Sequence, residues 1–226
     1  MPENKLNFAF KIKKTSRRKT ISFIIKDGFV LVLSPKYITE SYIQKLLIKK
    51  EKWIEKKLKE QTKNINIKEK KFKNGECLFY FGEKLTLYSY LNKDTSIKIN
   101  QGILHVGVKR KNSNLKKIIE SWYINQIQKY VEHNIYKISN QMYINFNSIK
   151  YRNYKRKLGS CNLTGDLAFN WRIVMIPKEV INYILVHELC HIKHFNHSKD
   201  FWHMVGEHIP EYKNYNIWLK KNINMM

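Results

Sequence analysis

Residues Val186–His197 have the sequence VHELCHIKHFNH and contain four of the chain's eight histidines. The order is His187-Glu188-x-x-His191, and a further histidine, His197, follows six residues later. Side chains four residues apart on a helix lie on the same face, so His187 and His191 can bind one metal ion together. Six of the eight histidines fall between residues 187 and 208. The helical spacing and this clustering predict a metal site.

The residue types at these positions also indicate a reaction. Zinc lowers the pKa of a bound water towards neutrality, and a nearby carboxylate accepts the proton as the water attacks a carbonyl. Glu188 is placed to reach such a water without binding the metal. The motif predicts a zinc-dependent metallopeptidase that hydrolyses peptide bonds with a metal-activated water and Glu188 as general base. A purely structural zinc site is the less favoured alternative, because it does not require that carboxylate.

The third metal ligand is expected after a turn of the chain. His197 has the spacing required if the helix stops and the chain turns back under the metal. Such a turn usually needs a residue with positive φ, and the stretch His194-Phe195-Asn196 contains no glycine. Asn and His tolerate positive φ better than most residues, so the turn is feasible without glycine. The alternatives to His197 as third ligand are His194, His203, Glu207 and His208.

The elements around the motif follow from its flanking sequence. Pro177 is expected in the first turn of the motif helix, which should end near His194–Asn196. Ser198 can cap a following short helix, in which Phe201 and Trp202 are expected to anchor the turn that carries His197. A last helix should run from Pro210 to about Lys221.

Two strands are expected before the motif helix, over Ser148–Tyr154 and Leu167–Val174. An extended substrate peptide often adds as a strand at the edge of a sheet beside an active site, and Leu167–Val174 is our candidate for that edge. An ordinary core strand is the alternative interpretation. His203, Tyr183 and Tyr212 could each supply a hydrogen bond near the metal.

The three cysteines and the N-terminal sequence indicate the cellular compartment in which the protein is expected. Cys190 points about 100° away from His191 around the helix and is expected to pack, whereas Cys161 is a weak candidate for a metal ligand. An odd cysteine number and an N-terminus without a signal peptide predict reduced thiols in the cytosol. No run approaches the roughly 20 apolar residues that would span a membrane.

The first half of the sequence predicts mostly strands. Apolar and polar residues alternate in Leu6–Lys13 and Thr20–Lys26, and Phe29–Leu33 is an apolar run. Between the last two, Asp27-Gly28 predicts a hairpin turn. A helix is expected from Thr39 to about Gln61. Further strands are expected at Cys77–Phe81, Leu85–Leu91, Ser96–Asn100 and Ile103–Val108, and a long helix at Leu115–Met142.

The chain is strongly basic. Its 43 lysines and arginines against 18 acidic residues give a formal net charge of +25. Such a charge attracts nucleic acid or other polyanions, although lysines spread over a solvated surface would give the same number. The alternative function is therefore a nucleic-acid-associated zinc protein, including a protease that acts on DNA-bound proteins.

The stretch GSCNLTGDLAFNWRIVMIPKEVINYILVHELCHIKHFNHSKDFW, residues 159–202, resembles the core of the YgjP-like metallopeptidases, relatives of the SprT-like and WLM zinc proteases. The resemblance implies that His187, His191 and His197 bind zinc and that Glu188 is catalytic. The family usually has Trp-Gly-Ser-Cys where this chain has Leu158 before Gly159, which puts in doubt any role of that tryptophan. SprT-like relatives act on DNA-bound proteins, which would suit the basic charge.

Together these patterns predict an α+β protein with two domains. Residues 1–112 are expected to form a β-rich N-terminal domain with one long helix. Residues 113–226 are expected to form a zincin-like metallopeptidase domain whose active-site helix carries the HExxH motif. Its partners would be a protein or peptide substrate and, through the basic surface, nucleic acid.

Overall fold

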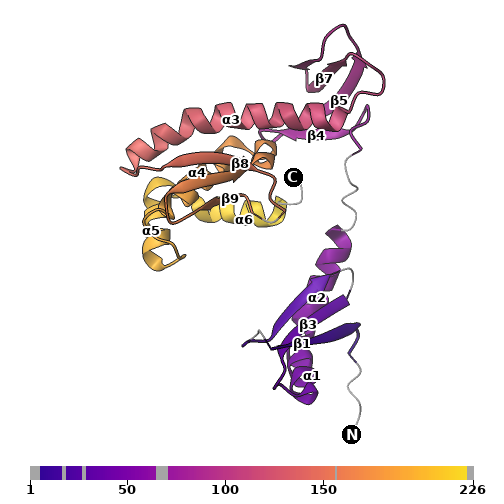
Figure 1. Cartoon of the computed structure of the whole chain (residues 1–226), viewed down its shortest axis with the longest axis vertical. Helices are drawn as coiled ribbons and strands as arrows, with labels where there is room; N and C mark the ends of the chain where they lie inside the picture. The colour runs from indigo at the N-terminus through magenta and orange to yellow at the C-terminus, as the bar shows by residue number, and fades with distance from the viewer. Residues whose placement is uncertain (1–5, 17–18, 27–28, 65–70, 156, 223–226) are drawn as a thin grey trace. The chain divides into compact units, whose positions relative to one another are not determined.

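A computed structural model describes residues 6–16, 19–26, 29–64, 71–155 and 157–222. Contacts divide the chain into two compact units, Met1–Glu69 and Lys70–Met226, and each has its own buried core (Figure 1). Both units mix helices with strands, so the predicted α+β class is confirmed. None of the described helices is long and apolar enough to cross a membrane.

The first unit is a small sheet packed on two helices. Its strands are β1 (Phe10–Thr15), β2 (Ser22–Lys26) and β3 (Phe29–Pro35), in the order β1-β3-β2. The strand β3 is antiparallel to β2, as the hairpin prediction requires, and parallel to β1. Asp27 and Gly28, the predicted turn, lie outside the described residues. The core of the unit consists of Val30, Val32, Ile43, Leu47 and Ile54.

The single helix predicted over Thr39–Gln61 is in fact two helices, α1 (Glu40–Lys49) and α2 (Glu51–Asn64). They are separated at Lys50, which has φ −105° and ψ 8°. A straight helix of that length would extend for about 35 Å, whereas a seven-residue strand such as β3 extends for about 23 Å. The break allows both helices to bury apolar residues on one short sheet.

The second unit begins with a four-stranded sheet in the order β4-β5-β7-β6. The strand pairs β4/β5 and β6/β7 are antiparallel, and β5 and β7 are parallel. The four predicted strands of this region are all present, with ends shifted by at most two residues. Their bounds are Cys77–Tyr80 (β4), Glu83–Leu91 (β5), Ser96–Asn100 (β6) and Ile103–Val108 (β7).

The long helix α3 (Leu115–Gln141) links this sheet to the rest of the unit. Its buried residues recur every fourth position, at Ile119, Tyr123, Ile127, Val131 and Ile135. The Tyr123 hydroxyl donates to the Phe79 carbonyl oxygen of β4 at 2.7 Å. These buried positions join the four-stranded sheet and α3 in one core. For this reason the division between units falls after Glu69 and differs from the domain boundary expected near residue 112.

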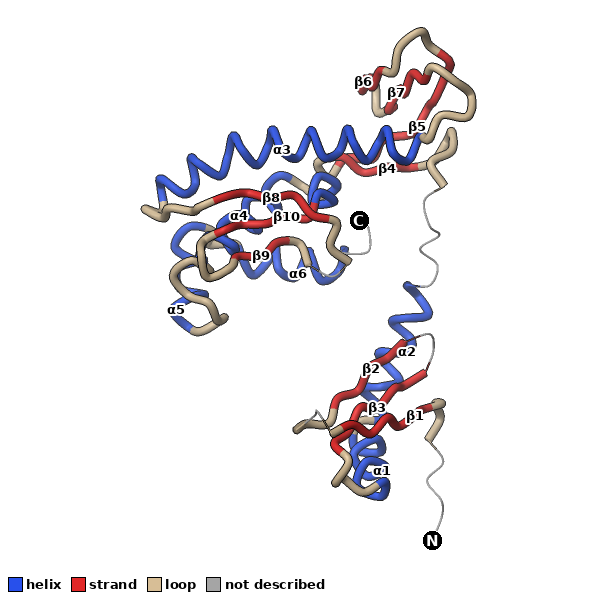
Figure 2. The backbone as a smooth tube through the Cα atoms, viewed as in Figure 1, coloured by secondary structure: helices blue, strands red, loops and turns tan. Residues whose placement is uncertain are grey.

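A second sheet of three strands lies closer to the histidine motif. Its strands are β8 (Ser148–Arg152), β9 (Gly159–Cys161) and β10 (Asp166–Asn170). Figure 2 shows β10 between the other two strands, parallel to β8 and antiparallel to β9.

The strand predicted over Leu167–Val174 differs from the structure in two respects. It ends at Asn170, whose side-chain oxygen accepts a hydrogen bond from the Arg172 amide and caps the 3₁₀ helix η1 (Trp171–Met175). Its position is also central in the sheet, so the prediction that it forms the edge beside the active site was wrong. The edge on the side of the motif helix is β9, which packs against that helix.

Candidate metal centre and its cavity

The motif lies on α4 (Lys178–Cys190), a helix buried on most of its surface. The residue before it, Pro177, lies at its N-cap, as the sequence predicts for the start of the helix. Pro177 is held in place by the β4–β5 turn. A Cβ atom on Gly82, which has φ +87°, would lie 2.9 Å from the Pro177 ring, so this close approach requires glycine.

The helix α4 ends earlier than predicted, at Cys190, and His191 is its C-cap. The chain then turns back towards α5 (Lys199–His208), whose N-cap Ser198 accepts a hydrogen bond from the Phe201 amide, as predicted. Residues 194–196 include no glycine, in agreement with the expectation that the turn is feasible without one, and none of them has a positive φ. These residues have negative φ, which any amino acid can adopt, so the turn does not need glycine.

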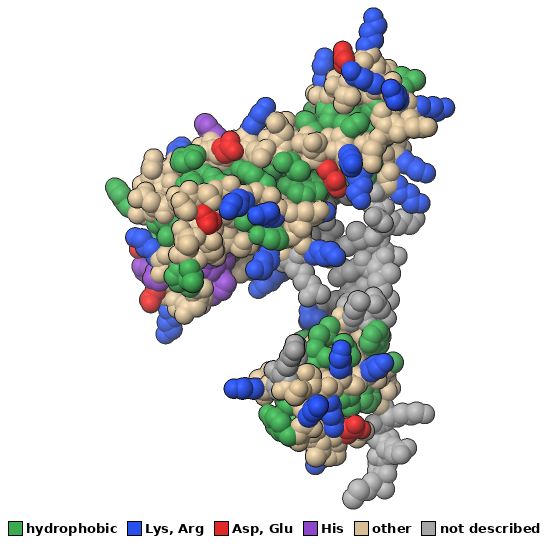
Figure 3. Space-filling model, in the orientation of Figure 1, with side chains coloured by type: hydrophobic (Ala, Val, Ile, Leu, Met, Phe, Trp, Pro, Cys, Tyr) green, Lys and Arg blue, Asp and Glu red, His purple; other side chains and the backbone are tan. Residues whose placement is uncertain are grey.

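The turn brings three imidazoles together. Candidate ligand atoms of His187, His191 and His197 lie within 4.8 Å of one another. The Nε2 atoms of His187 and His197 are 3.1 Å apart. Two nitrogen ligands of a tetrahedral zinc ion, each about 2.05 Å from the metal, lie about 3.3 Å from each other. The spacing of this pair therefore fits a shared ion, and Figure 3 shows histidine side chains gathered on the face of the unit near α5.

One buried ring supports all three histidines. The ring centroid of Phe201, a fully buried residue of α5, lies 4.6 Å from that of His191, 5.0 Å from that of His187 and 4.8 Å from that of His197. Trp202 stacks on His197 with a centroid distance of 5.5 Å. The expectation that these two aromatic residues anchor the His197 turn agrees with these contacts.

The surroundings of His187 and His191 favour neutral imidazoles, which have the free lone pair that a metal requires. Burial, followed by the neighbouring His191 and His197, lowers the pKa of His187 to about 3. Burial also lowers the pKa of His191. The Nδ1 atom of His191 lies 3.0 Å from the His194 carbonyl oxygen. A proton donated along that bond leaves Nε2 free to act as a ligand.

His187 carries a feature that packing alone does not explain. Its Nδ1 atom is buried and has no hydrogen-bond partner among the described residues. An unpaired buried polar group destabilises a fold by about 1–3 kcal/mol, and such groups are rare in native structures. A histidine retained under that penalty is more typical of a functional site than of a packed core.

Glu188 faces the same site from a buried position. Only 6% of its surface is exposed, and burial raises the pKa of its carboxyl to about 8, while Lys157 acts in the opposite direction. The backbone of Gly159 in β9 packs directly on this side chain. A Cβ atom at residue 159 would lie 2.6 Å from Oε1, 2.7 Å from Cγ and 2.8 Å from Cδ of Glu188. Only a glycine leaves Glu188 where it is.

A cavity of about 460 Å³ joins these groups. It is lined by residues 157–161, by the face of α4 that carries His187 and Glu188, by Phe195 and His197 of the turn, and by Asn216 and Leu219 of α6 (Tyr212–Asn222). Tyr183, four residues before His187, also lines it, and burial raises its pKa to about 12. The Tyr183 hydroxyl therefore stays protonated and can donate a hydrogen bond within the cavity.

The strand β9, whose residues line the cavity, pairs with no described strand on one of its sides. Leu158 and Asn162 make main-chain hydrogen bonds with β10, at 2.8 Å and 3.2 Å. Successive residues of an antiparallel strand direct their N–H and C=O groups to opposite sides. The main-chain groups of Gly159 and Cys161 therefore point away from β10, to an edge that no described strand covers.

The other residues singled out in the sequence lie elsewhere. Among the described residues, the histidine cluster does not include His194, His203, Glu207 or His208. The Nδ1 atom of His203 lies 3.5 Å from a carboxyl oxygen of Glu207 instead, and neither His203 nor Tyr212 lines the cavity. Cys190 is fully buried, as expected for packing, and burial raises the pKa of the Cys161 thiol to about 11, so it is not a thiolate.

The close approach of Gly159 to Glu188 and the contribution of α6 to the cavity were not predicted. The sequence signal for the first was the Gly-Ser-Cys triplet, which has no periodic relation to the HExxH motif. Leu158 lines the cavity at the position where the family usually has tryptophan.

Comparisons with known proteins bear on these features. A family model described as "YgjP-like, metallopeptidase domain" matches residues 19–222. The crystal structure of the abylysin metallopeptidase zymogen from Pyrococcus abyssi is 22% identical over 40% of this chain and 93% of that chain, with a TM-score of 0.37. The jannalysin zymogen from Methanocaldococcus jannaschii is 24% identical over 41% and 96%, with a TM-score of 0.38.

No curated protein matches this chain. The family match covers most of the sequence, including the histidine motif, both sheets of the second unit and the helices that enclose the cavity. The chain belongs to the YgjP-like metallopeptidase family.

Proposed function

We propose that this metallopeptidase is zinc-dependent, that His187, His191 and His197 are its metal ligands and that Glu188 is its general base. The observation that carries the proposal is the meeting of three imidazoles and one buried carboxyl in a single cavity. The three histidines leave one position of a tetrahedral ion open, as a catalytic zinc site requires and a structural one does not.

Zinc held there would polarise a substrate carbonyl and lower the pKa of a water in the open position. Glu188 would accept the proton of the attacking water and deliver it to the leaving amine. Its raised pKa suits this task, because a stronger base takes the proton more readily and the acid form can still release it. A cation beside the carboxyl would lower that pKa again, so Glu188 would be ionised when the ion is bound.

The substrate is proposed to bind as an extended peptide along β9. The main-chain groups of Gly159 and Cys161 pair with no described strand at that edge, which is where an added strand would form its hydrogen bonds. Leu158, Ile184 and Phe195 supply apolar surface to the cavity for the side chains of that peptide. The strand β9 therefore takes the place of Leu167–Val174, which was expected from the sequence to form the edge for the substrate.

The test separates metal binding from hydrolysis. The Glu188→Gln variant should keep its zinc by elemental analysis and lose hydrolysis of a fluorescein-labelled denatured casein. The His197→Ala variant should lose both, because two histidines alone bind zinc weakly. The matched control is His203→Ala, which removes an exposed histidine outside the cluster and should change neither quantity.

Two results would contradict the proposal. Casein hydrolysis by Glu188→Gln at the parental rate would exclude Glu188 as the base. Full zinc occupancy in His197→Ala would exclude His197 as a ligand. If the parent held zinc but cleaved no protein, the alternative of a binding protein with a structural metal would be favoured.

A further inference from the structure

The four-stranded sheet of the second unit has one covered face and one open face. On the covered face, Leu85, Leu87, Leu104 and Val106 are almost fully buried in the core. Side chains alternate between the two faces of a strand, so the intervening residues point to the other side. That outer face is formed by the positions between these buried residues, and its exposed side chains include two tyrosines, Tyr88 and Tyr90, which are 50% and 37% exposed.

The two tyrosine rings are arranged as a platform. They lie two residues apart on β5, with ring centroids 6.1 Å apart and planes inclined by only 21°. In the neighbouring strand β7, His105 is the partner of Tyr88 and packs edge-on against its ring at 5.7 Å. Lys98 of β6 is in turn the partner of His105. A row of aromatic, imidazole and ammonium groups therefore crosses three strands.

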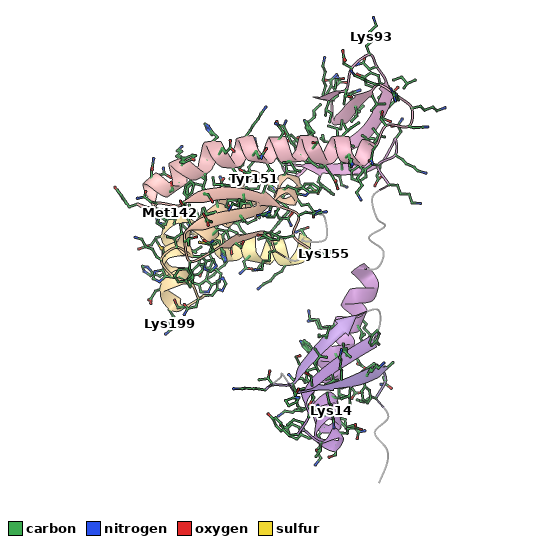
Figure 4. The ribbon with its side chains drawn as sticks, in the orientation of Figure 1. Lys14, Lys93, Met142, Tyr151, Lys155 and Lys199 are labelled. Carbon is green, nitrogen blue, oxygen red and sulfur yellow. The ribbon has the colours of Figure 1, made fainter. Side chains whose placement is uncertain are left out.

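The charge of this face is positive. Lys84 lies on β5 on the same side as Tyr88, and neither it nor Lys98 forms an ion pair with a described residue. The alternation of side chains assigns each position of the four strands to the inner or the outer face. No position assigned to the outer face carries an acidic side chain. Lys93 projects from the turn between β5 and β6 (Figure 4), and Figure 3 shows further blue side chains around this end of the unit.

We propose that this outer face, defined by Lys84, Tyr88, Tyr90, His105 and Lys98, binds single-stranded nucleic acid. Proteins that bind single strands combine basic groups, which follow the phosphates, with aromatic rings on which unpaired bases stack. The face has both components on adjacent strands. An acidic peptide would use the lysines but would gain little from two exposed, nearly parallel rings, whereas every base has a flat surface that can stack on them.

None of the residues of the outer face lines the histidine cavity. Binding at this face would therefore survive loss of the peptidase activity, and the two proposals can fail separately. A nucleic-acid surface on the same unit as the cavity would also account for part of the excess positive charge.

The experiment uses the full chain and a fluorescein-labelled oligothymidylate of about 15 nucleotides, measured by fluorescence anisotropy at two salt concentrations. Tyr88→Ala and Tyr90→Ala leave the net charge unchanged, and each should weaken binding about fivefold or more. Tyr88→Phe and Tyr90→Phe retain the rings and should bind as the parent does. The matched control is Tyr136→Ala, which removes a tyrosine of α3 that is 58% exposed and should leave the affinity unchanged.

The lysines are tested through the salt dependence. Replacing Lys84 and Lys98 together by glutamine should reduce the slope of log K against log salt by about 1.4, as expected for two lost phosphate contacts to a single strand. The proposal is overturned if the parent does not bind the oligonucleotide, or if the alanine variants bind it as tightly as the parent. It is also overturned if polyglutamate displaces the probe as effectively as unlabelled oligothymidylate, which would indicate a site for acidic protein segments.

Discussion

The contact between Gly159 and Glu188 leads to the sharpest prediction. A Cβ atom at residue 159 would lie 2.6 Å from the nearest Glu188 atom, whereas carbon and oxygen atoms pack without repulsion at about 3.5 Å. The Gly159→Ala variant must therefore displace the Glu188 carboxyl by about 0.9 Å or move β9 away from α4. A catalytic group misplaced by about 1 Å loses on the order of 100-fold in rate, so kcat/KM should fall by about that factor.

The three atoms nearest to that Cβ all belong to Glu188 and none to a histidine. The zinc content of Gly159→Ala should therefore equal that of the parent by elemental analysis. Its free energy of unfolding should fall by about 1–3 kcal/mol, the usual effect of overpacking a buried site. The matched control is Gly206→Ala on α5, where the nearest atom to the new Cβ would be 3.4 Å away, an ordinary contact that should leave hydrolysis unchanged.

A double-mutant cycle tests the cause directly. Glu188→Ala removes all three clashing atoms, so adding Gly159→Ala to that background should have almost no further effect on the free energy of unfolding. The reasoning is refuted if Gly159→Ala hydrolyses casein at the parental rate. An equal loss of stability in the parent and in the Glu188→Ala background would refute it as well.

Two further predictions concern the surroundings of the site. Phe201→Ala should lower the free energy of unfolding by about 3–5 kcal/mol and the zinc affinity by about tenfold or more, because this buried ring contacts all three imidazoles. Competition with a chelator measures the zinc affinity. An equal loss in the control variant Phe195→Ala, which changes an exposed residue, would contradict the prediction. Hydrogen bonds from Ser148, Asn162 and Thr164 hold the pKa of Asp166 well below its usual value. Since the folded-state pKa is the lower one, the carboxylate stabilises the fold above about pH 4 and this stabilisation is lost as the pH falls further. Asp166→Asn should therefore flatten the acid side of a plot of unfolding free energy against pH, and parallel curves for variant and parent would contradict this.

Much of the local structure was predictable because it depends on short-range periodicity. The four strands of the second unit's first sheet and the helix α3 follow from alternation and from helical spacing. The predictions failed where a boundary depended on packing between elements or on a side-chain cap. The helix over Thr39–Gln61 is broken at Lys50 to fit a short sheet, and the strand predicted to Val174 ends at Asn170, where a side chain caps a 3₁₀ helix.

The sequence by itself determined the candidate chemistry: an HExxH motif in which the spacing of His187 and His191 places two imidazoles on one helix face, with Glu188 beside them. The tertiary structure alone decided that His197 approaches His187, that Phe201 lies against all three rings, and that Gly159 of β9 contacts Glu188. It also decided that the edge of the sheet beside the motif helix is β9 and not β10. The physical reason is that spacing along one element is set by its backbone geometry, whereas contacts between elements depend on how their buried faces pack together.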